Sequence, residues 1–434
     1  MTKNMKTSFK KYYAAVRYVE SLSEVSKPEY VKAKANRDKK MERFRLFMDK
    51  LGNPQLNQKY IHISGTSGKG SVAAMTQSVL VTAGYKTGLF LSPHTTTKID
   101  RIKVNNLFIS PKEFADLVDY IKPAIREIIK SPYGRPTHFE ICLAIAFLYF
   151  KKKKCDYVVL EVSCGGKYDP TNIIPTPKVA IVNLVDYDHE HILGHTLPAI
   201  ARQKAGIIKP GCAFFTTISN KKSVLAVLKK GCQKNKAPYY CINGNKKYKL
   251  QLPGEHQSTN ANLVAAVCQY LRVPKKTITA GLKKTKIPCR FEIMQKNPLV
   301  IIDGAHNNSK FKTTLDILKN LTRERLFIII ALTQQKRALT FFKDIAGQAD
   351  SIFITKHSNG FHKCSQPQAL KKEIIKYHPQ KKIEVIPEPQ KALQRTLKMA
   401  GKKDVILITG SLYLAGELRK NWVPEELILR TRKA

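Results

Sequence analysis

The sequence predicts an α/β protein with two domains, and three observations carry this prediction. From about residue 59 onwards, short β-rich runs alternate with helical patterns, as in parallel sheets whose strands are joined by helices. The runs "CDYVVLEV" and "KVAIVNLV" are almost continuously apolar, which is expected of strands that helices cover on both faces. The length of 434 residues exceeds one ordinary domain and suits two or three.

The elements follow in order along the chain. Residues 1–40 are polar and basic and are expected to form a helical extension. In residues 41–287, the first predicted domain, strands are expected at "YIHIS" and "KTGLFLS", and helices at "SVAAMTQSVLVTAG", "HFEICLAIAFLYFKKK" and "LPAIARQKAGIIKPG". Residues 288–434 show the same alternation, with strands expected at "PLVIIDGA", "RLFIIIALT", "DSIFITKH", "KIEVIP" and "DVILITG". These residues form the second predicted α/β domain.

The composition restricts the class of protein. Hydrophobic residues make up 43% and charged residues 25% of the chain, which is normal for a globular protein. The longest apolar run, "ICLAIAFLYF", has about ten residues, too few to span a bilayer, and the basic N-terminus lacks the apolar stretch of a signal peptide. Nine cysteines without a C-x-x-C pair indicate reduced thiols. A cytoplasmic protein with no membrane partner is therefore expected.

The formal net charge of +44 has three explanations. A nucleic-acid partner, attraction of polyanionic small molecules, and a lysine-rich surface with no specific partner would each account for it. The basic residues are scattered in short runs such as "KKKK" at residues 151–154. No basic arm or RNA-binding signature stands out, so nucleic acid is the least favoured of the three.

The stretch "HISGTSGKGSVAAM", residues 62–75, has the chemistry of a phosphate-binding loop. Its glycines let backbone N–H groups converge on an anion, Lys69 supplies a cation, and the following helix, expected to open at Ser71, turns its positive end towards the loop. The usual spelling G-x-x-x-x-G-K-[ST] is not met, because Ile63 replaces the first glycine and Gly70 precedes the serine. The alternative is a glycine turn with a chance lysine.

Further polar groups are expected at the same edge of the predicted sheet. Ser92 follows the second strand, Glu161 ends a buried strand, and Asp188 and His189 follow the next one. Each of them alone is more often a turn or surface residue. However, ligands of open parallel sheets gather outside the carboxyl ends of the strands, and Mg²⁺ prefers few protein ligands together with phosphates and water. The set therefore predicts a magnesium–ATP site.

A series of motifs covers about residues 42–420 in order. They are "GTSGKGS", "SPH", "THFE", "EVSCGGKYDPTN", "DHEHILGHTLPAIARQKAGIIKPG", "GEHQSTNANLVAA", "CRFE", "DGAHN" and "TGSLYLAGELR". This series resembles the folylpolyglutamate synthase/dihydrofolate synthase branch of the Mur ligase family, including the displaced serine of the loop. The resemblance implies an N-terminal P-loop NTPase-like domain with a parallel sheet, a Rossmann-like C-terminal α/β domain, and an active site in the cleft between them.

The resemblance also implies an activity. ATP would activate a folate-type carboxylate, of dihydropteroate or of a tetrahydrofolate polyglutamate, as an acyl phosphate, and L-glutamate would then form an amide with it. It implies a monomer with small-molecule substrates and no nucleic-acid partner. It further implies two Mg²⁺ sites, with Lys204 at a position that is carbamylated in the family and helps to hold the second ion.

Site residues are carried over from the family motifs to matching positions of this chain. The expected catalytic residues are Lys69, Lys204 and His189. The residues expected to contact ATP are Thr66, Ser67, Gly68, Lys69, Gly70, Ser71, Asn260, Arg290, Asp303 and His306. The expected metal ligands are Ser92, Glu161 and His189. The pterin and carboxylate side is expected at Thr137, His138, Phe139, Glu140, Tyr168, Asp169 and Pro170.

The substrate side departs from the family pattern at three places. The stretch "ANRDKKMERFRLFMDKLGNPQ" lacks the family's Gly-Leu segment, "SCGGK" replaces "GLGGR", and "TQQKRAL" replaces an acidic stretch in the second domain. Lys167 keeps the charge of the family's arginine but loses its planar fork. Three hypotheses therefore stay open: a folate-type ligase, the same chemistry on another carboxylate, and a non-catalytic P-loop protein that binds nucleic acid. The retained lysines and metal ligands speak against the third.

Overall fold

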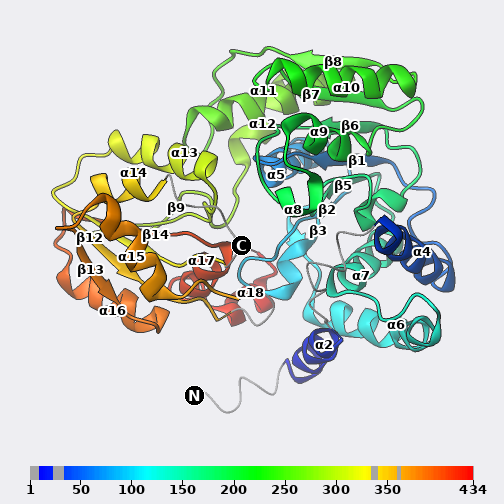
Figure 1. Ribbon diagram of the computed structural model, residues 1–434. Helices are drawn as coiled ribbons and strands as arrows, with labels where there is room; N and C mark the ends of the chain where they lie inside the picture. Colours follow the sequence, from blue (N-terminus) through cyan, green and yellow to red (C-terminus); the bar gives the residue numbers. More distant parts are fainter. Residues whose placement is uncertain (1–8, 23–33, 334–340, 359–362, 434) are drawn as a thin grey trace.

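The structure, a computed structural model, describes residues 9–22, 34–333, 341–358 and 363–433 and contains two α/β units (Figure 1). The first unit is built on an eight-stranded sheet with strand order β4-β3-β2-β5-β1-β6-β7-β8. Its strands are β1 (Tyr60–Ser64), β2 (Thr87–Phe90), β3 (Ile102–Val104), β4 (Leu107–Phe108), β5 (Tyr157–Glu161), β6 (Val179–Val182), β7 (Ala213–Thr217) and β8 (Tyr239–Ile242). The order from β2 to β8 is parallel, and β3 and β4 form an antiparallel edge.

Helices cover both faces of this sheet, as the apolar strands predicted. The helices of the first unit are α2 (Lys10–Ser21), α4 (Lys34–Lys50), α5 (Lys69–Thr82), α6 (Pro111–Lys130), α7 (His138–Lys152), α8 (Glu190–Leu193), α9 (Leu197–Ala205), α10 (Lys222–Lys234), α11 (Glu255–Tyr270) and α12 (Lys275–Lys284). Helix α5 begins at Lys69, two residues before the expected Ser71, because the left-handed Gly68 ends the loop. The hairpin β3–β4 and the long helix α6 were not expected from the sequence.

The second unit is built on a six-stranded sheet with strand order β13-β12-β11-β14-β10-β9. Its strands are β9 (Glu292–Lys296), β10 (Leu299–Ile302), β11 (Leu326–Ile330), β12 (Ser351–Ile354), β13 (Lys382–Val385) and β14 (Val405–Thr409). Its helices are α13 (Asn308–Lys319), α14 (Phe341–Gln348), α15 (Pro367–Tyr377), α16 (Pro389–Met399), α17 (Leu412–Arg419) and α18 (Glu425–Thr431). All neighbours are parallel except β9, which pairs antiparallel with β10. The predicted α/β fold with two parallel-dominated sheets is thus confirmed.

The two ends of the described chain pack on the first unit. In α2, Tyr12 and Val19 belong to the hydrophobic core beside α6, and the Tyr12 and Phe114 rings lie 5.7 Å apart. In α18, Ile428 and Leu429 belong to that same core. The last helix therefore returns to the first unit although it follows the second in the chain, because its apolar face is buried only there.

Some expectations fall on residues outside the described ranges. Within the extension at residues 1–40, the structure describes helix α2 and the start of α4. Nearly all of "TQQKRAL" lies at 334–340, outside the described residues. Among the described helices, none has the length and apolar character that crossing a bilayer requires.

Candidate active site

The phosphate-binding loop connects β1 to α5 and is shaped by its glycines. Gly68 has a left-handed φ of 76°, and a Cβ there would lie 2.3 Å from the side-chain nitrogen of Asn183, so the position requires glycine. The Thr66 N–H donates to the Leu184 carbonyl at 2.7 Å and ties the loop to the end of β6. The Ser67 hydroxyl is buried without a hydrogen-bond partner, and α5 has no side-chain cap. Both features fit a bound phosphate.

Two lysines from distant parts of the sequence meet at the Gly65 carbonyl. Lys69 Nζ donates to this oxygen at 3.1 Å and Lys204 Nζ at 2.9 Å. Lys204 is only 4% exposed, and burial, followed by the positive charge of Lys69, lowers its pKa to about 7. Its amine therefore loses its proton far more readily than an ordinary lysine. The structure brings together the two lysines that were predicted to be catalytic.

The predicted metal ligands are brought together in part. The Ser92 N–H donates to Oε2 of Glu161 at 3.0 Å. His189 lies on the loop after β6, with a left-handed φ of 51°, and its Nε2 is 3.8 Å from Asp188. Within the described ranges, no group of three His, Cys, Asp or Glu residues is arranged to hold a metal ion. Mg²⁺ does not need such a group, since phosphate and water complete its coordination.

The environment of Glu161 tests whether a cation fits at this position. Its carboxylate is 6% exposed, and burial raises its pKa, although Lys69, the Ser92 N–H and Arg290 act in the opposite direction. The neighbouring positive groups therefore do not offset the desolvation of the charged form. A divalent cation would do so, and the buried Glu161 carboxylate thus fits a bound Mg²⁺.

A chain of side-chain amides supports the loop from below. Asn183 Nδ2 donates to the Ser67 carbonyl at 3.1 Å and to Asn260 Oδ1 at 2.8 Å. Asn260 Nδ2 in turn donates to Gln257 Oε1 at 3.0 Å. The predicted ATP-contacting Asn260 is 4% exposed, and its hydrogen bonds with Asn183 and Gln257 support the loop. Asn183 was not predicted, although its place at the carboxyl end of a strand is the signal that identified Glu161.

The predicted residues of the second unit differ in their availability to a ligand. Asp303 is 8% exposed, and its carboxylate accepts from the Phe291 N–H at 2.8 Å, the Ala305 N–H at 2.9 Å and the Thr314 hydroxyl at 3.0 Å. It therefore organises the loop around Arg290. His306 Nε2 lies 2.9 Å from Lys310 Nζ.

Two charged residues of the second unit act on Glu161 of the first unit. The positive charges of Arg290 and Lys310 both oppose the rise that burial causes in the pKa of Glu161. Asn307 Nδ2 also reaches Asp188 Oδ2 at 3.5 Å. Lys310 was missed in the sequence, where only its position after "DGAHN" pointed to it.

Several residues predicted to contact the pterin side are bonded within the protein. Glu140 is fully buried, caps α7 with Thr137, and receives two hydrogen bonds from Arg43 at 3.0 and 2.9 Å. Asp169 accepts from the N–H groups of Ser163 and Cys164 at 3.1 and 3.0 Å and from Thr171. These carboxylates fix the local structure of the predicted substrate side.

The remaining residues of that side lie nearby. Pro170 starts the short helix η2 (Pro170–Ile173), and η2 packs against α4. Phe139 makes an edge contact with Phe90 at 5.6 Å between ring centres. His138 begins α7, with Nδ1 3.5 Å from Arg101. Tyr168 has the Arg37 guanidinium 5.0 Å and the Lys167 amine 5.2 Å from its ring centre.

Comparison with known proteins matches both units. Residues 63–239 match the Mur ligase middle domain, and residues 289–412 match the family described as Mur ligase, glutamate ligase domain. The dihydrofolate synthase/folylpolyglutamate synthase of Bacillus subtilis is 30% identical over 410 residues, covering 87% of this chain and 94% of that protein.

Solved structures give the same result. Folylpolyglutamate synthase of Mycobacterium tuberculosis, complexed with ADP and AMPPCP, superposes with a TM-score of 0.82 at 25% identity, over 88% of this chain and 95% of that one. Folylpolyglutamate synthase of Thermotoga maritima superposes with a TM-score of 0.78 at 29% identity, over 96% and 98%. The chain therefore belongs to the folylpolyglutamate synthase/dihydrofolate synthase branch of the Mur ligase family and is an ATP-dependent ligase.

Proposed function

We propose that this ligase joins L-glutamate to a folate-type carboxylate, of dihydropteroate or of a tetrahydrofolate polyglutamate. The observation that carries the proposal is the meeting of Lys69 and Lys204 at the Gly65 carbonyl, beside the buried carboxylate of Glu161. The names of the relatives, dihydrofolate synthase and folylpolyglutamate synthase, support the choice of substrates.

The proposed reaction has two steps. A carboxylate is a poor electrophile, so one of its oxygens first attacks the γ-phosphorus of ATP, which releases ADP and forms an acyl phosphate. The uncharged α-amine of glutamate then attacks the acyl carbon, phosphate leaves, and an amide remains. Lys69 and the N–H groups of the loop would stabilise the charge of the transferring phosphoryl group. The second unit would bring the amine close to the acyl carbon.

Mg²⁺ belongs to this proposal, with Ser92, Glu161 and His189 as the residues that would hold it. Its role would be to neutralise the charge of the phosphates. The lowered pKa of Lys204 supports a second part of the proposal, because an uncharged amine can add to CO₂ with loss of one proton. The resulting carbamate would offer oxygen atoms to a second Mg²⁺.

One observation favours a second candidate, in which the same chemistry acts on a more anionic carboxylate. Arg37 and Lys167 both lie over Tyr168, so two positive charges flank the expected substrate side. A pterin ring makes little use of them, whereas further carboxylates would pair with them, whether they belong to a folate polyglutamate or to a substrate without a pterin.

The proposal includes a monomer in the reducing cytoplasm without a nucleic-acid partner. All nine cysteines are free thiols, which suits that compartment. The charge of +44 is then a bias of the whole surface. ATP and glutamate would use only a local part of it.

Phosphate release tests the proposal directly. ATP and glutamate are supplied with dihydropteroate, with tetrahydrofolate, or without a pterin. Release that requires either pterin is expected, and Lys69→Ala is expected to abolish it while the circular dichroism spectrum stays unchanged. Stimulation by neither pterin would favour the second candidate, and full activity of Lys69→Ala would contradict the assigned site.

A further inference from the structure

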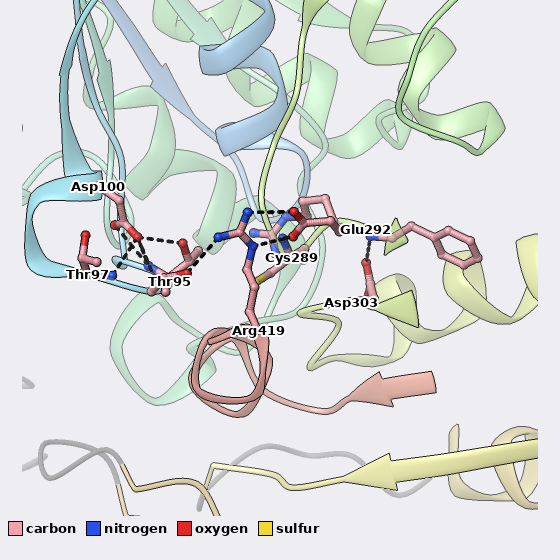
Figure 2. A network of polar contacts seen from close by, with 10 residues as sticks. Thr95, Thr97, Asp100, Cys289, Glu292, Asp303 and Arg419 are labelled. Atoms are coloured by element: carbon pink, nitrogen blue, oxygen red, sulfur yellow. Dashed lines mark hydrogen bonds and ion pairs between the residues drawn. The ribbon is translucent and has the colours of Figure 1, made fainter. Parts of the chain in front are cut away.

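A buried arginine at the end of α17 joins the second unit to the first. The Arg419 side chain is 3% exposed, and it donates from Nε to Glu292 Oε2 and from Nη2 to Glu292 Oε1, both at 2.9 Å. Its remaining nitrogen, Nη1, reaches the Thr96 hydroxyl of the first unit at 3.4 Å. Figure 2 shows the guanidinium between Glu292 on one side and the loop of Thr95 and Thr97 on the other.

On the side of the first unit, Arg419 contacts the loop that begins with the predicted metal ligand Ser92. The Asp100 carboxylate fixes the other end of this loop. It accepts hydrogen bonds from the N–H groups of Thr95, Thr96 and Thr97 at 2.8 to 3.2 Å. Helix α17 packs closely against the same loop at Gly416, where an added Cβ would lie 1.8 Å from the Thr95 carbonyl oxygen. The loop is thus held from within by Asp100 and from the second unit by α17.

On the other side, Glu292 fixes the segment that carries Arg290. Its Oε2 accepts from the Cys289 N–H at 2.8 Å. Cys289 and Phe291, on either side of Arg290, have left-handed φ angles of 57° and 47°. A residue other than glycine adopts a left-handed backbone conformation only when its surroundings impose it. The Glu292–Cys289 bond and the bond from the Phe291 N–H to Asp303, at 2.8 Å, impose it here.

We propose that Arg419 is a positioning residue that sets the Ser92 loop and Arg290 relative to each other, and so aligns the two halves of the ATP site. The Arg419 guanidinium donates hydrogen bonds to Glu292 in the second unit and to Thr96 in the first. Because the guanidinium is planar, it fixes the direction of both contacts. The proposal rests on the proposed function only in naming ATP as the ligand that bridges the two units.

The experiment compares three conservative variants of the full chain. Arg419→Lys keeps the charge but loses the fork, and Glu292→Gln keeps the shape but loses the charge. The control is Arg325→Lys, which alters a more exposed arginine–carboxylate pair inside the second unit, where Arg325 donates to Asp404 at 2.7 Å. The measurements are the dissociation constant of AMPPCP by calorimetry, KM for ATP and kcat from phosphate release, and the midpoint of urea unfolding.

We expect Arg419→Lys and Glu292→Gln each to weaken AMPPCP binding and raise KM for ATP by about tenfold, the effect of losing one charge-assisted hydrogen bond. Arg325→Lys is expected to lower the unfolding midpoint and leave AMPPCP binding unchanged. If Arg419→Lys binds AMPPCP as tightly as the wild type, or if all three variants weaken binding equally, the positioning role is wrong.

The binding measurement also separates this proposal from the proposed function. AMPPCP binding needs no folate, so it decides the role of Arg419 by itself. A wild-type protein that binds AMPPCP but releases no phosphate with any pterin would contradict the folate assignment only.

Discussion

Replacing Lys204, the buried lysine of the candidate active site, should stabilise the folded protein. In Lys204→Met, the ammonium group is removed and the apolar length of the side chain is kept. Burial lowers the pKa of Lys204 from the usual lysine value of 10.5 to about 7. Each unit of pKa shift corresponds to about 1.4 kcal/mol, so the buried amine destabilises the folded protein by about 5 kcal/mol at neutral pH.

The sign follows from proton binding in the two states. Between the folded pKa of about 7 and the unfolded value, the unfolded chain binds one more proton than the folded protein, so wild-type stability rises with pH across this window. Below the folded pKa the penalty is constant. We therefore expect Lys204→Met to be more stable by a few kcal/mol at neutral pH and below, and the gain should disappear as the pH approaches the unfolded pKa. The lost bond to the Gly65 carbonyl reduces the gain by about 1 kcal/mol.

The assay is urea unfolding of both proteins from about pH 6 to about pH 10, without nucleotide and in buffer freed of CO₂. Lys69→Met serves as the control, because it removes the other amine bonded to the Gly65 carbonyl. A difference in the free energy of unfolding that stays constant with pH, or a Lys204→Met protein less stable than the wild type at neutral pH, would refute the reasoning.

Two further substitutions test the loop and the substrate side. Gly68→Ala should lower the free energy of unfolding by about 1–2 kcal/mol, because a left-handed φ is costly for alanine. It should also abolish AMPPCP binding, since the new Cβ would lie 2.3 Å from the Asn183 side chain. Thermal unfolding with and without AMPPCP measures both effects, and tight binding of AMPPCP would contradict this close fit. Arg43→Met leaves Glu140 buried and unpaired, so a loss of about 3–5 kcal/mol is expected. In urea unfolding, the double variant with Glu140→Gln should recover part of this loss, and purely additive losses would show that the pair is not coupled.

The phosphate-binding loop and the edge of the first sheet could be predicted because their chemistry is local in the sequence. Residues 65–71 contain the glycines, the lysine and the start of the helix within one turn of chain. Ser92 and Glu161 each follow a recognisable strand, and a parallel sheet brings strand ends to one edge. The Ser92–Glu161 contact at 3.0 Å bears out that inference.

Other features depend on partners that are far away in the sequence. Lys204 lies 139 residues from Gly65, Arg43 lies 97 residues from Glu140, and Arg419 lies 127 residues from Glu292. No period or spacing signals such a pair. The motif "THFE" therefore suggested that Glu140 faces a ligand, whereas the fold gives both its oxygens to Arg43.

By itself, the sequence determined the alternation of strands and helices, the glycine-rich loop after the first strand and the edge of the sheet where we propose that the ligase chemistry lies. Hydrophobic periodicity and loop chemistry act over a few residues, so they can be read along the chain. Only the tertiary structure decided which carboxylates are bonded within the protein, that Lys204 is buried with a pKa of about 7, and that α18 packs on the first unit. Burial and ion pairing are properties of the packed molecule, because they arise when segments distant in sequence exclude water together.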